Sequence, residues 1–141
     1  MPKENVESLR AFLETIADIH ALVDAGKRGD ADLSVLDPEV VYEDTNLPDH
    51  IGETYRGHEG VLRAAERWAD ASETLTIELE RIVGSGDRLV SIHKSRATGR
   101  HSGIEIREPL AYTWTFRNGK IIHFRSYRDT GEALEAAGVA K

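Results

Sequence analysis

The chain of 141 residues contains no cysteine, so it can have no disulfide framework, no thiolate nucleophile and no cysteine metal ligand. It also lacks any apolar run near the length of a membrane span, about 20 residues. Its first residues lack the apolar stretch of a signal peptide. Together these absences indicate a globular protein of the cytoplasm that does not enter membranes.

Recognisable metal and cofactor motifs are missing as well. The six histidines are scattered, and none shows the His-x-x-x-His or His-x-His spacing of a metal site. The glycine-rich turns at Gly84 and Gly99 connect predicted strands to strands, whereas a phosphate-binding loop connects a strand to a helix. The nucleophilic serine elbow of hydrolases is absent too. We therefore expect no metal and no cofactor.

The charge balance is acidic, with a net charge of −7, and the basic residues are spread along the chain among the acidic ones. Binding to nucleic acid needs a basic patch that contacts phosphates. An acidic surface also repels anionic membranes. The composition therefore argues against both partners, and the length suits one domain with its own core over residues 1–141.

Apolar residues recur every three or four positions from Glu4 to about Ala25, which predicts a long amphipathic helix. His20 lies on its apolar side, where it could be a core histidine or a functional one. A second periodic stretch predicts a helix from about Glu59 to Ala71, with Trp68 on its apolar face. A short helix over Asp30 to Leu36 is expected between these two helices.

The stretch from Val40 to Thr45 alternates as a strand does, which places Val40, Tyr42 and Asp44 on the same face. A carboxylate delivered beside a tyrosine toward the interior is a candidate acid/base group. The alternative is that Asp44 only turns the chain before the following loop, because aspartate is common in turns.

The second half of the chain changes to a period of two, which predicts an antiparallel meander. Four strands are expected, over residues 75–80, 89–98, 104–116 and 120–128. Asn118-Gly119 is the strongest hairpin signal, and Pro109 predicts a bulge or a sheet edge. A capped helix is expected from Asp129 to Ala137.

The late strands carry large side chains on one face, and His93, on the strand before them, could point to either face. The expected face comprises Leu110, Tyr112, Trp114 and Phe116 on one strand and Ile122, Phe124 and Ser126 on the next. Helices followed by a meander indicate an α+β fold, with the helices on one face of a curved sheet. So many aromatic side chains favour an apolar pocket at the open end of this sheet.

Five longer stretches have residue patterns that are typical of a known protein family. They are Leu36–Asp44, Tyr55–Val61, Gly86–Val90, Thr113–Ile121 and Glu132–Gly138. On these stretches nearly the whole chain resembles the nuclear-transport-factor-2-like (NTF2-like) superfamily and, within it, the SnoaL-like and ketosteroid-isomerase-like proteins. The resemblance implies a cone-shaped α+β barrel whose strongly curved mixed or antiparallel sheet wraps around a long N-terminal helix. It also implies a homodimer formed through the outer face of the sheet.

Ketosteroid isomerase provides one template for catalysis. Its general-base aspartate stands in a Glu-Asp dipeptide that falls on Glu43-Asp44. Its oxyanion-hole aspartate falls on Tyr112, and a phenol can also donate a hydrogen bond to a developing oxyanion. Its first-helix tyrosine falls on His20 by ungapped counting. The resemblance therefore implies catalytic roles for Asp44, Tyr112 and His20.

Two further templates fit less well. Limonene-epoxide-hydrolase-like chemistry needs an Asp-Arg-Asp group, whose positions fall on Ser126 and near His93 and Ser95. Because the carboxylates are missing, this chemistry is disfavoured. The acid/base aspartate of the SnoaL-type cyclases also falls on Ser126.

These observations lead to one main hypothesis and two alternatives. The main hypothesis is a cofactor-independent isomerase, cyclase or dehydratase that moves a proton on a small apolar molecule with a ring or a carbonyl group. The alternatives are a non-catalytic module that binds a small ligand and a dimeric interaction scaffold. The residues expected to line the ligand pocket are Tyr42, Trp68, His93, Leu110, Trp114, Phe124 and Ser126.

Overall fold

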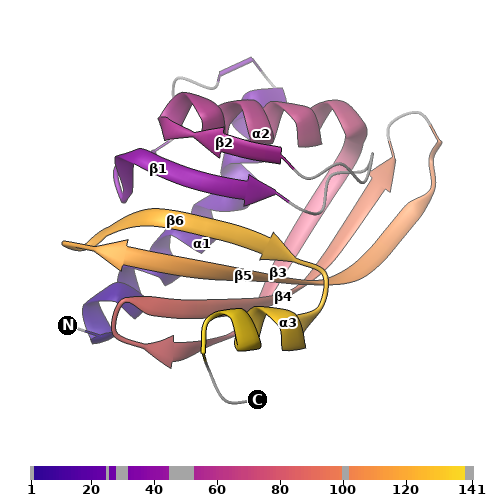
Figure 1. The fold of residues 1–141 in the computed structure, drawn as a ribbon. Coiled ribbons are helices and arrows are strands. Elements are labelled where there is room, and N and C mark those ends of the chain that lie inside the picture. Colours follow the sequence, from indigo (N-terminus) through magenta and orange to yellow (C-terminus); the bar gives the residue numbers. More distant parts are fainter. Residues whose placement is uncertain (1, 25, 28–31, 45–52, 100–101, 139–141) are drawn as a thin grey trace.

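The computed structural model describes residues 2–24, 26–27, 32–44, 53–99 and 102–138, which fold into helices packed on a sheet (Figure 1). The elements in chain order are α1 (Pro2–Asp24), β1 (Leu36–Asp44), β2 (Glu53–Arg56), α2 (Gly57–Ala71), β3 (Ser72–Ser85), β4 (Arg88–Gly99), β5 (Glu105–Arg117), β6 (Lys120–Tyr127) and α3 (Thr130–Ala136).

The strands form one six-stranded sheet in the order β2-β1-β6-β5-β4-β3. Strands β1 and β6 are parallel, and every other neighbouring pair is antiparallel. The sheet is mixed and open, with β2 and β3 at its edges. The predicted α+β class is confirmed.

Helix α1 packs its apolar stripe against the sheet, as its periodicity predicts. Leu9 is fully buried, and the Phe12 ring meets the Trp114 ring edge to face with centroids 5.9 Å apart. The buried Asn5 side chain donates a hydrogen bond to the Gly86 carbonyl, which ties α1 to the β3–β4 turn. The face of the sheet on this side is called the inner face.

The hairpin between β5 and β6 confirms the Asn-Gly signal. Asn118 and Gly119 have φ angles of +53° and +78°, and two positive values in succession are typical of a tight hairpin turn. The β5–β6 register then shifts between Thr115 and Phe116. This bulge brings Ile121 into the core in place of the predicted Ile122, which is only half-buried.

One local prediction needs correction, and one open alternative is decided. Residues 32–35 form a turn and Leu36 begins β1, so the short helix is wrong over this part; residues 28–31 lie outside the described residues. The Asp32 carboxylate accepts a hydrogen bond from the Ser34 backbone N–H, and this local bond competes with a helix. Pro109 lies where β5 pairs with β4 alone and without a register shift, so it marks an edge and not a bulge.

The third helix packs on the opposite, outer face of the sheet (Figure 1), so the prediction of all helices on one face is wrong. Val90, Ile92 and Ala111 alternate outward from β4 and β5, and α3 covers them with Leu134. The helix begins with the predicted cap, since Asp129 Oδ1 accepts a hydrogen bond from the Glu132 N–H at 3.2 Å.

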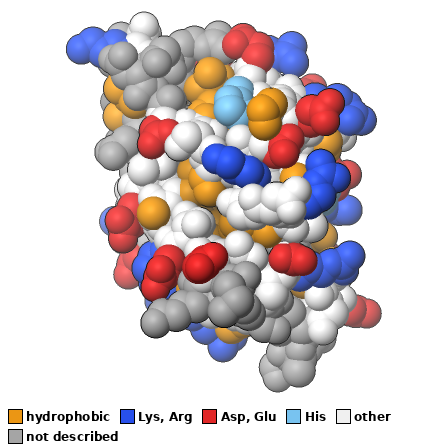
Figure 2. All heavy atoms as spheres, turned by 90° about the vertical axis from the view of Figure 1, so that its left-hand side faces the viewer, with side chains coloured by type: hydrophobic (Ala, Val, Ile, Leu, Met, Phe, Trp, Pro, Cys, Tyr) orange, Lys and Arg blue, Asp and Glu red, His pale blue; other side chains and the backbone are white. Residues whose placement is uncertain are grey.

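The surface mixes charges of both signs. Figure 2 shows acidic and basic side chains interspersed around small apolar areas on one face of the molecule. None of the described helices is both long enough and apolar enough to cross a membrane.

Candidate functional site

The inner face of the sheet carries a continuous layer of aromatic rings. Cross-strand pairing places Phe124 beside both Tyr42 and Trp114. Its ring stacks on Tyr42 with centroids 4.3 Å apart and on Trp114 with centroids 4.7 Å apart. Tyr112 and His93 extend the layer, with the His93 ring edge-to-face against Tyr112 at 5.6 Å. The alternation of the strands therefore produces the apolar wall that the sequence predicts.

Asp44 lies at the end of β1 and is fully buried at one end of this layer. The Ser126 hydroxyl donates a hydrogen bond to Asp44 Oδ1 over 3.3 Å. The Tyr42 phenol lies beside both groups, since Asp44 and Ser126 each influence its pKa. Burial of a carboxylate is costly unless such donors surround it, so β1 and β6 together provide the site that accepts Asp44.

Tyr112 lies next to Tyr42 in the layer, with their ring centroids 6.5 Å apart. Burial raises the pKa of the Tyr112 phenol above its ordinary value, and the Asp44 charge raises it further. Burial likewise raises the pKa of Tyr42 well above the ordinary value, helped by the neighbouring Tyr112 and Asp44. Both phenols therefore stay protonated at neutral pH, as hydrogen-bond donors must.

His93 points to the inner face, which decides between the two orientations left open by the sequence. Its side chain is buried, and burial lowers the pKa of the imidazole to about 4. The ring is therefore neutral near pH 7. Its Nε2 atom lies 2.7 Å from the Ser91 hydroxyl, which also accepts a hydrogen bond from the Trp114 indole at 2.8 Å.

The structure brings together most of the predicted site residues. Buried side chains from four strands meet on the inner face: Tyr42, Asp44, His93, Leu110, Tyr112, Trp114, Phe124 and Ser126. Two predicted residues are not tested, because the side chains of His20 on α1 and Trp68 on α2 lie outside the described residues.

Two polar contributions were missed by the sequence analysis. Tyr42 was expected only as a pocket wall, yet its phenol lies beside both Asp44 and Tyr112. Ser91 was expected on the face of Leu89 and His93 but was given no role. A serine between two inward residues of a buried strand is the signal that could have identified it.

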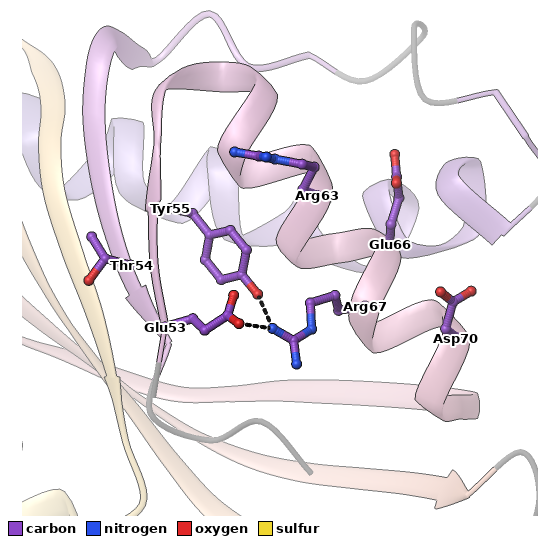
Figure 3. A pocket seen from close by; sticks show the side chains of 7 residues that line it. All are labelled: Glu53, Thr54, Tyr55, Arg63, Glu66, Arg67 and Asp70. Atoms are coloured by element: carbon purple, nitrogen blue, oxygen red, sulfur yellow. Dashed lines mark hydrogen bonds and ion pairs between the residues drawn. The ribbon is translucent and has the colours of Figure 1, made fainter. Parts of the chain in front are cut away.

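A polar hollow of about 390 Å³ lies on the surface between β2 and α2 (Figure 3). Arg67 of α2 points toward β2, where it pairs with the Glu53 carboxylate and donates to the Tyr55 hydroxyl. These contacts raise the pKa of Arg67 further. None of the predicted pocket residues lines this hollow, which is lined by Glu53, Thr54, Tyr55, Arg63, Glu66, Arg67 and Asp70.

Metal ligands do not converge in the part of the chain that the structure describes, where no group of three or more histidine, aspartate or glutamate side chains could hold a metal ion. The inner-face network instead consists of one carboxylate, two phenols, two hydroxyls, an indole and an imidazole. These groups can donate, accept and transfer protons without a metal.

Comparison with known proteins identifies the family. The model of the SnoaL-like domain matches residues 10–124. The chain belongs to the SnoaL-like family. Solved structures of the NTF2-like type share the fold, and no curated protein matches the sequence.

Three of these structures cover nearly all of the chain. An NTF2-like protein of unknown function from Burkholderia pseudomallei K96243 is 20% identical over 95% of this chain and 97% of its own, with a TM-score of 0.72. TerC, co-crystallized with polyporic acid, is 20% identical over 96% and 98%, with a TM-score of 0.70. A putative SnoaL-like polyketide cyclase from Jannaschia sp. CCS1 is 17% identical over 100% and 96%, with a TM-score of 0.70. At these identities the similarity concerns the fold.

Proposed function

We propose that this SnoaL-like protein is a cofactor-independent acid/base enzyme for a small apolar molecule that carries a ring and a carbonyl group. The observation that carries the proposal is the arrangement of a fully buried carboxylate, Asp44, which accepts a hydrogen bond from Ser126 and lies beside the buried phenols of Tyr42 and Tyr112. It places one carboxylate, the candidate base, beside phenols that remain protonated donors. An aromatic wall surrounds these groups.

The proposed roles follow from the chemistry of these groups. Asp44 removes a proton from the carbon next to the carbonyl, as a general base. The Tyr112 hydroxyl donates to the oxygen on which negative charge develops, and Tyr42 lies beside both Tyr112 and Asp44. Ser126 orients the carboxylate through its hydrogen bond to Oδ1. Isomerisation, cyclisation and dehydration can all begin with this proton transfer.

The ligand would lie against the ring layer of the inner face. The stacked rings of Tyr42, Phe124 and Trp114 suit a flat cyclic molecule, and Leu110 extends the apolar wall. His20 and Trp68, on the two helices packed against this face, remain proposed members of the site. The polyporic acid of TerC and the polyketide cyclase among the similar structures support a small-molecule role for this fold.

Proton exchange tests the reaction class without knowledge of the natural substrate. Cyclic ketones such as 1-tetralone are incubated in D₂O, and NMR follows the exchange of the protons next to the carbonyl. We expect faster exchange with the protein than in buffer, and a loss of about 10²- to 10⁴-fold in the added rate for Asp44→Asn. The matched control is Glu43→Gln. The Glu43 carboxylate is the neighbour of Asp44 in sequence, but it pairs with His123 on the outer face. Equal proton-exchange rates with the wild type and with Asp44→Asn would refute the role of Asp44 as the general base.

A non-catalytic binding module is the second candidate, and one observation favours it. Asp44 is fully buried and already accepts hydrogen bonds from its neighbours, as a purely structural carboxylate would. This alternative predicts that cyclic ketones bind without faster proton exchange. The same experiment therefore separates the two functions.

A further inference from the structure

A second polar cluster lies on the inner face, at the opposite end of the aromatic layer from Asp44. It consists of Ser91, His93 and Trp114. Tyr112 separates the two ends, because its ring contacts His93 on one side and Tyr42, next to Asp44, on the other. The proposed acid/base chemistry uses Asp44, Tyr42 and Tyr112 and leaves this second cluster without a role.

The direction of the hydrogen bonds in this cluster can be worked out. An indole N–H can only donate, so the Ser91 oxygen accepts from Trp114. Ser91 is fully buried and its own hydrogen needs an acceptor, which His93 Nε2 provides at 2.7 Å. If Nε2 accepts, the neutral imidazole carries its hydrogen on Nδ1. The Trp114–Ser91 pair thus selects one tautomer of His93.

The selected tautomer leaves a buried donor without a protein partner. Among the described residues, none forms a hydrogen bond with His93 Nδ1, although the side chain is only 2% exposed. Buried donors are satisfied in the great majority of cases, and an unsatisfied one is destabilising. An N–H group held in this way can recognise an oxygen that accepts a hydrogen bond.

His93 lies where the buried part of the β4–β5 ladder ends. His93 and Leu110 form the last buried pair of this ladder. The next pair on the same face, Ser95 and Glu108, is partly or fully exposed, and beyond it Ile106 is 51% exposed. The ends of β4 and β5 project past the point where β6 stops pairing (Figure 1). A ligand that reached the inner face from this side would contact His93 before Tyr112.

We infer that His93 Nδ1–H is a second recognition point of the site and binds an acceptor oxygen of the ligand, in a tautomer set by Ser91 and Trp114. This inference rests on the proposed function for the existence of a ligand on the inner face. It narrows the substrate class to flat cyclic molecules with two oxygen functions. One oxygen lies at the Tyr112 hydroxyl near Asp44, and the other lies at His93.

Histidine NMR tests the tautomer in the protein alone. Long-range ¹H–¹⁵N correlation of protein labelled at histidine distinguishes Nδ1–H from Nε2–H, and the signal missing in His93→Phe assigns the residue. We expect Nδ1–H for His93 in the wild type and a shift toward Nε2–H in Ser91→Ala. An Nε2–H tautomer in the wild type would overturn the inference.

Paired probes test recognition of the oxygen. 1-Tetralone carries only the carbonyl oxygen expected at Tyr112, and 4-hydroxy-1-tetralone has a second oxygen on the same carbon skeleton. We expect the wild type to bind 4-hydroxy-1-tetralone about five- to tenfold more tightly than 1-tetralone in calorimetric titrations, as one additional hydrogen bond would allow. His93→Phe should lose this preference while keeping its 1-tetralone affinity, and His123→Phe on the outer face should keep both.

The outcomes separate this inference from the proposed function. Equal affinity of the wild type for the two probes, including no measurable binding of either, would overturn the inference, and so would a preference that survives in His93→Phe. Glu43→Gln, on the outer face, should keep the preference for the second oxygen, since that residue does not contact the inner-face groups. Failure of the general base would instead appear as proton exchange unchanged in Asp44→Asn.

Discussion

Individual side chains on the inner face combine two opposing demands, burial and polarity. Asp44, His93 and the two phenols lie in a part of the core where a leucine or phenylalanine would be ordinary. Each is accommodated by a hydrogen-bonding neighbour on an adjacent strand or on its own strand. Polar groups concentrated in one part of a core are typical of sites where stability has been exchanged for function.

The pH dependence of stability should reveal the buried imidazole of His93. Its pKa falls from an ordinary 6.5 to about 4 because burial disfavours the cation, against a small opposing effect of Glu80. The unfolded chain therefore takes up a proton below pH 6.5 that the folded chain refuses until about pH 4. The contribution is present above pH 6.5 and is lost progressively as the pH falls, by about 3 kcal/mol in total.

Urea denaturation of wild type and His93→Gln between pH 7 and pH 4 measures this contribution. The variant should lose less stability over the interval than the wild type, because it has no group to protonate. Parallel curves for the two proteins would contradict the assignment.

Removal of the Tyr42 hydroxyl should destabilise the fold more than removal of an outer-face hydroxyl. Tyr42→Phe keeps the stacked ring but removes a buried hydroxyl that lies beside Asp44 and Ser126. We expect a loss of about 1–3 kcal/mol in the free energy of unfolding, measured by urea denaturation. Tyr127→Phe, on the partly exposed outer face, should change it by less than about 0.5 kcal/mol. Equal effects of both substitutions would argue against the Tyr42 network.

At the scale of elements, local signals predicted the parts of the fold that depend on neighbouring residues. The hairpin at Asn118, the cap at Asp129 and the ladder positions of β4 and β5 follow from turn chemistry and period. The bulge that brings Ile121 inward and the packing of α3 on the outer face depend on contacts distant in sequence. The residue pattern along one strand does not show which strand or helix packs against it. Neither the bulge nor the position of α3 could therefore be predicted.

The same distinction holds for the site. Alternation along β1 predicted that Asp44 and Tyr42 share a face, and the structure confirms it. The connection of Asp44 to Ser126 depends on the parallel pairing of β1 with β6. That pairing joins strands separated by most of the chain, and no local sequence pattern predicts it.

The β5–β6 turn should be sensitive to a side chain at its second position. Gly119→Ala forces a Cβ into a φ of +78°, although no neighbouring atom lies within 4 Å of the added group. We therefore expect a purely conformational cost of about 1 kcal/mol in the free energy of unfolding. Gly131→Ala, within helix α3 and outside the positive-φ positions, should be neutral or stabilising in the same denaturation experiment. A neutral Gly119→Ala would contradict the assigned turn.

At the scale of the whole molecule, helix α3 covers only part of the outer sheet face. Thr113, Thr115, Arg125 and Tyr127 remain partly exposed there, and the Arg125 guanidinium lies 5.0 Å from the centre of the Tyr127 ring. We propose that a second copy of the chain covers this surface, as the family resemblance implies. The inner face, with its candidate site, would then remain free on each protomer.

Sedimentation should therefore detect a homodimer that depends on this surface. Thr115→Arg adds a bulky charge to the outer face and should raise the dimer dissociation constant at least tenfold. Thr54→Arg, an exposed position on edge strand β2, provides the matched control and should leave the dimer intact. A wild-type monomer at micromolar concentration would contradict the proposed assembly.

The central claim is that Asp44 acts on the ligand as a base and does not merely support the core. Its most direct measurement compares ketone binding and proton exchange in one variant, Asp44→Asn, with 1-tetralone as the probe. The account predicts a dissociation constant within about threefold of the wild type and exchange at the rate of buffer alone. Exchange that persists at the wild-type rate, or binding and exchange lost together, would contradict it.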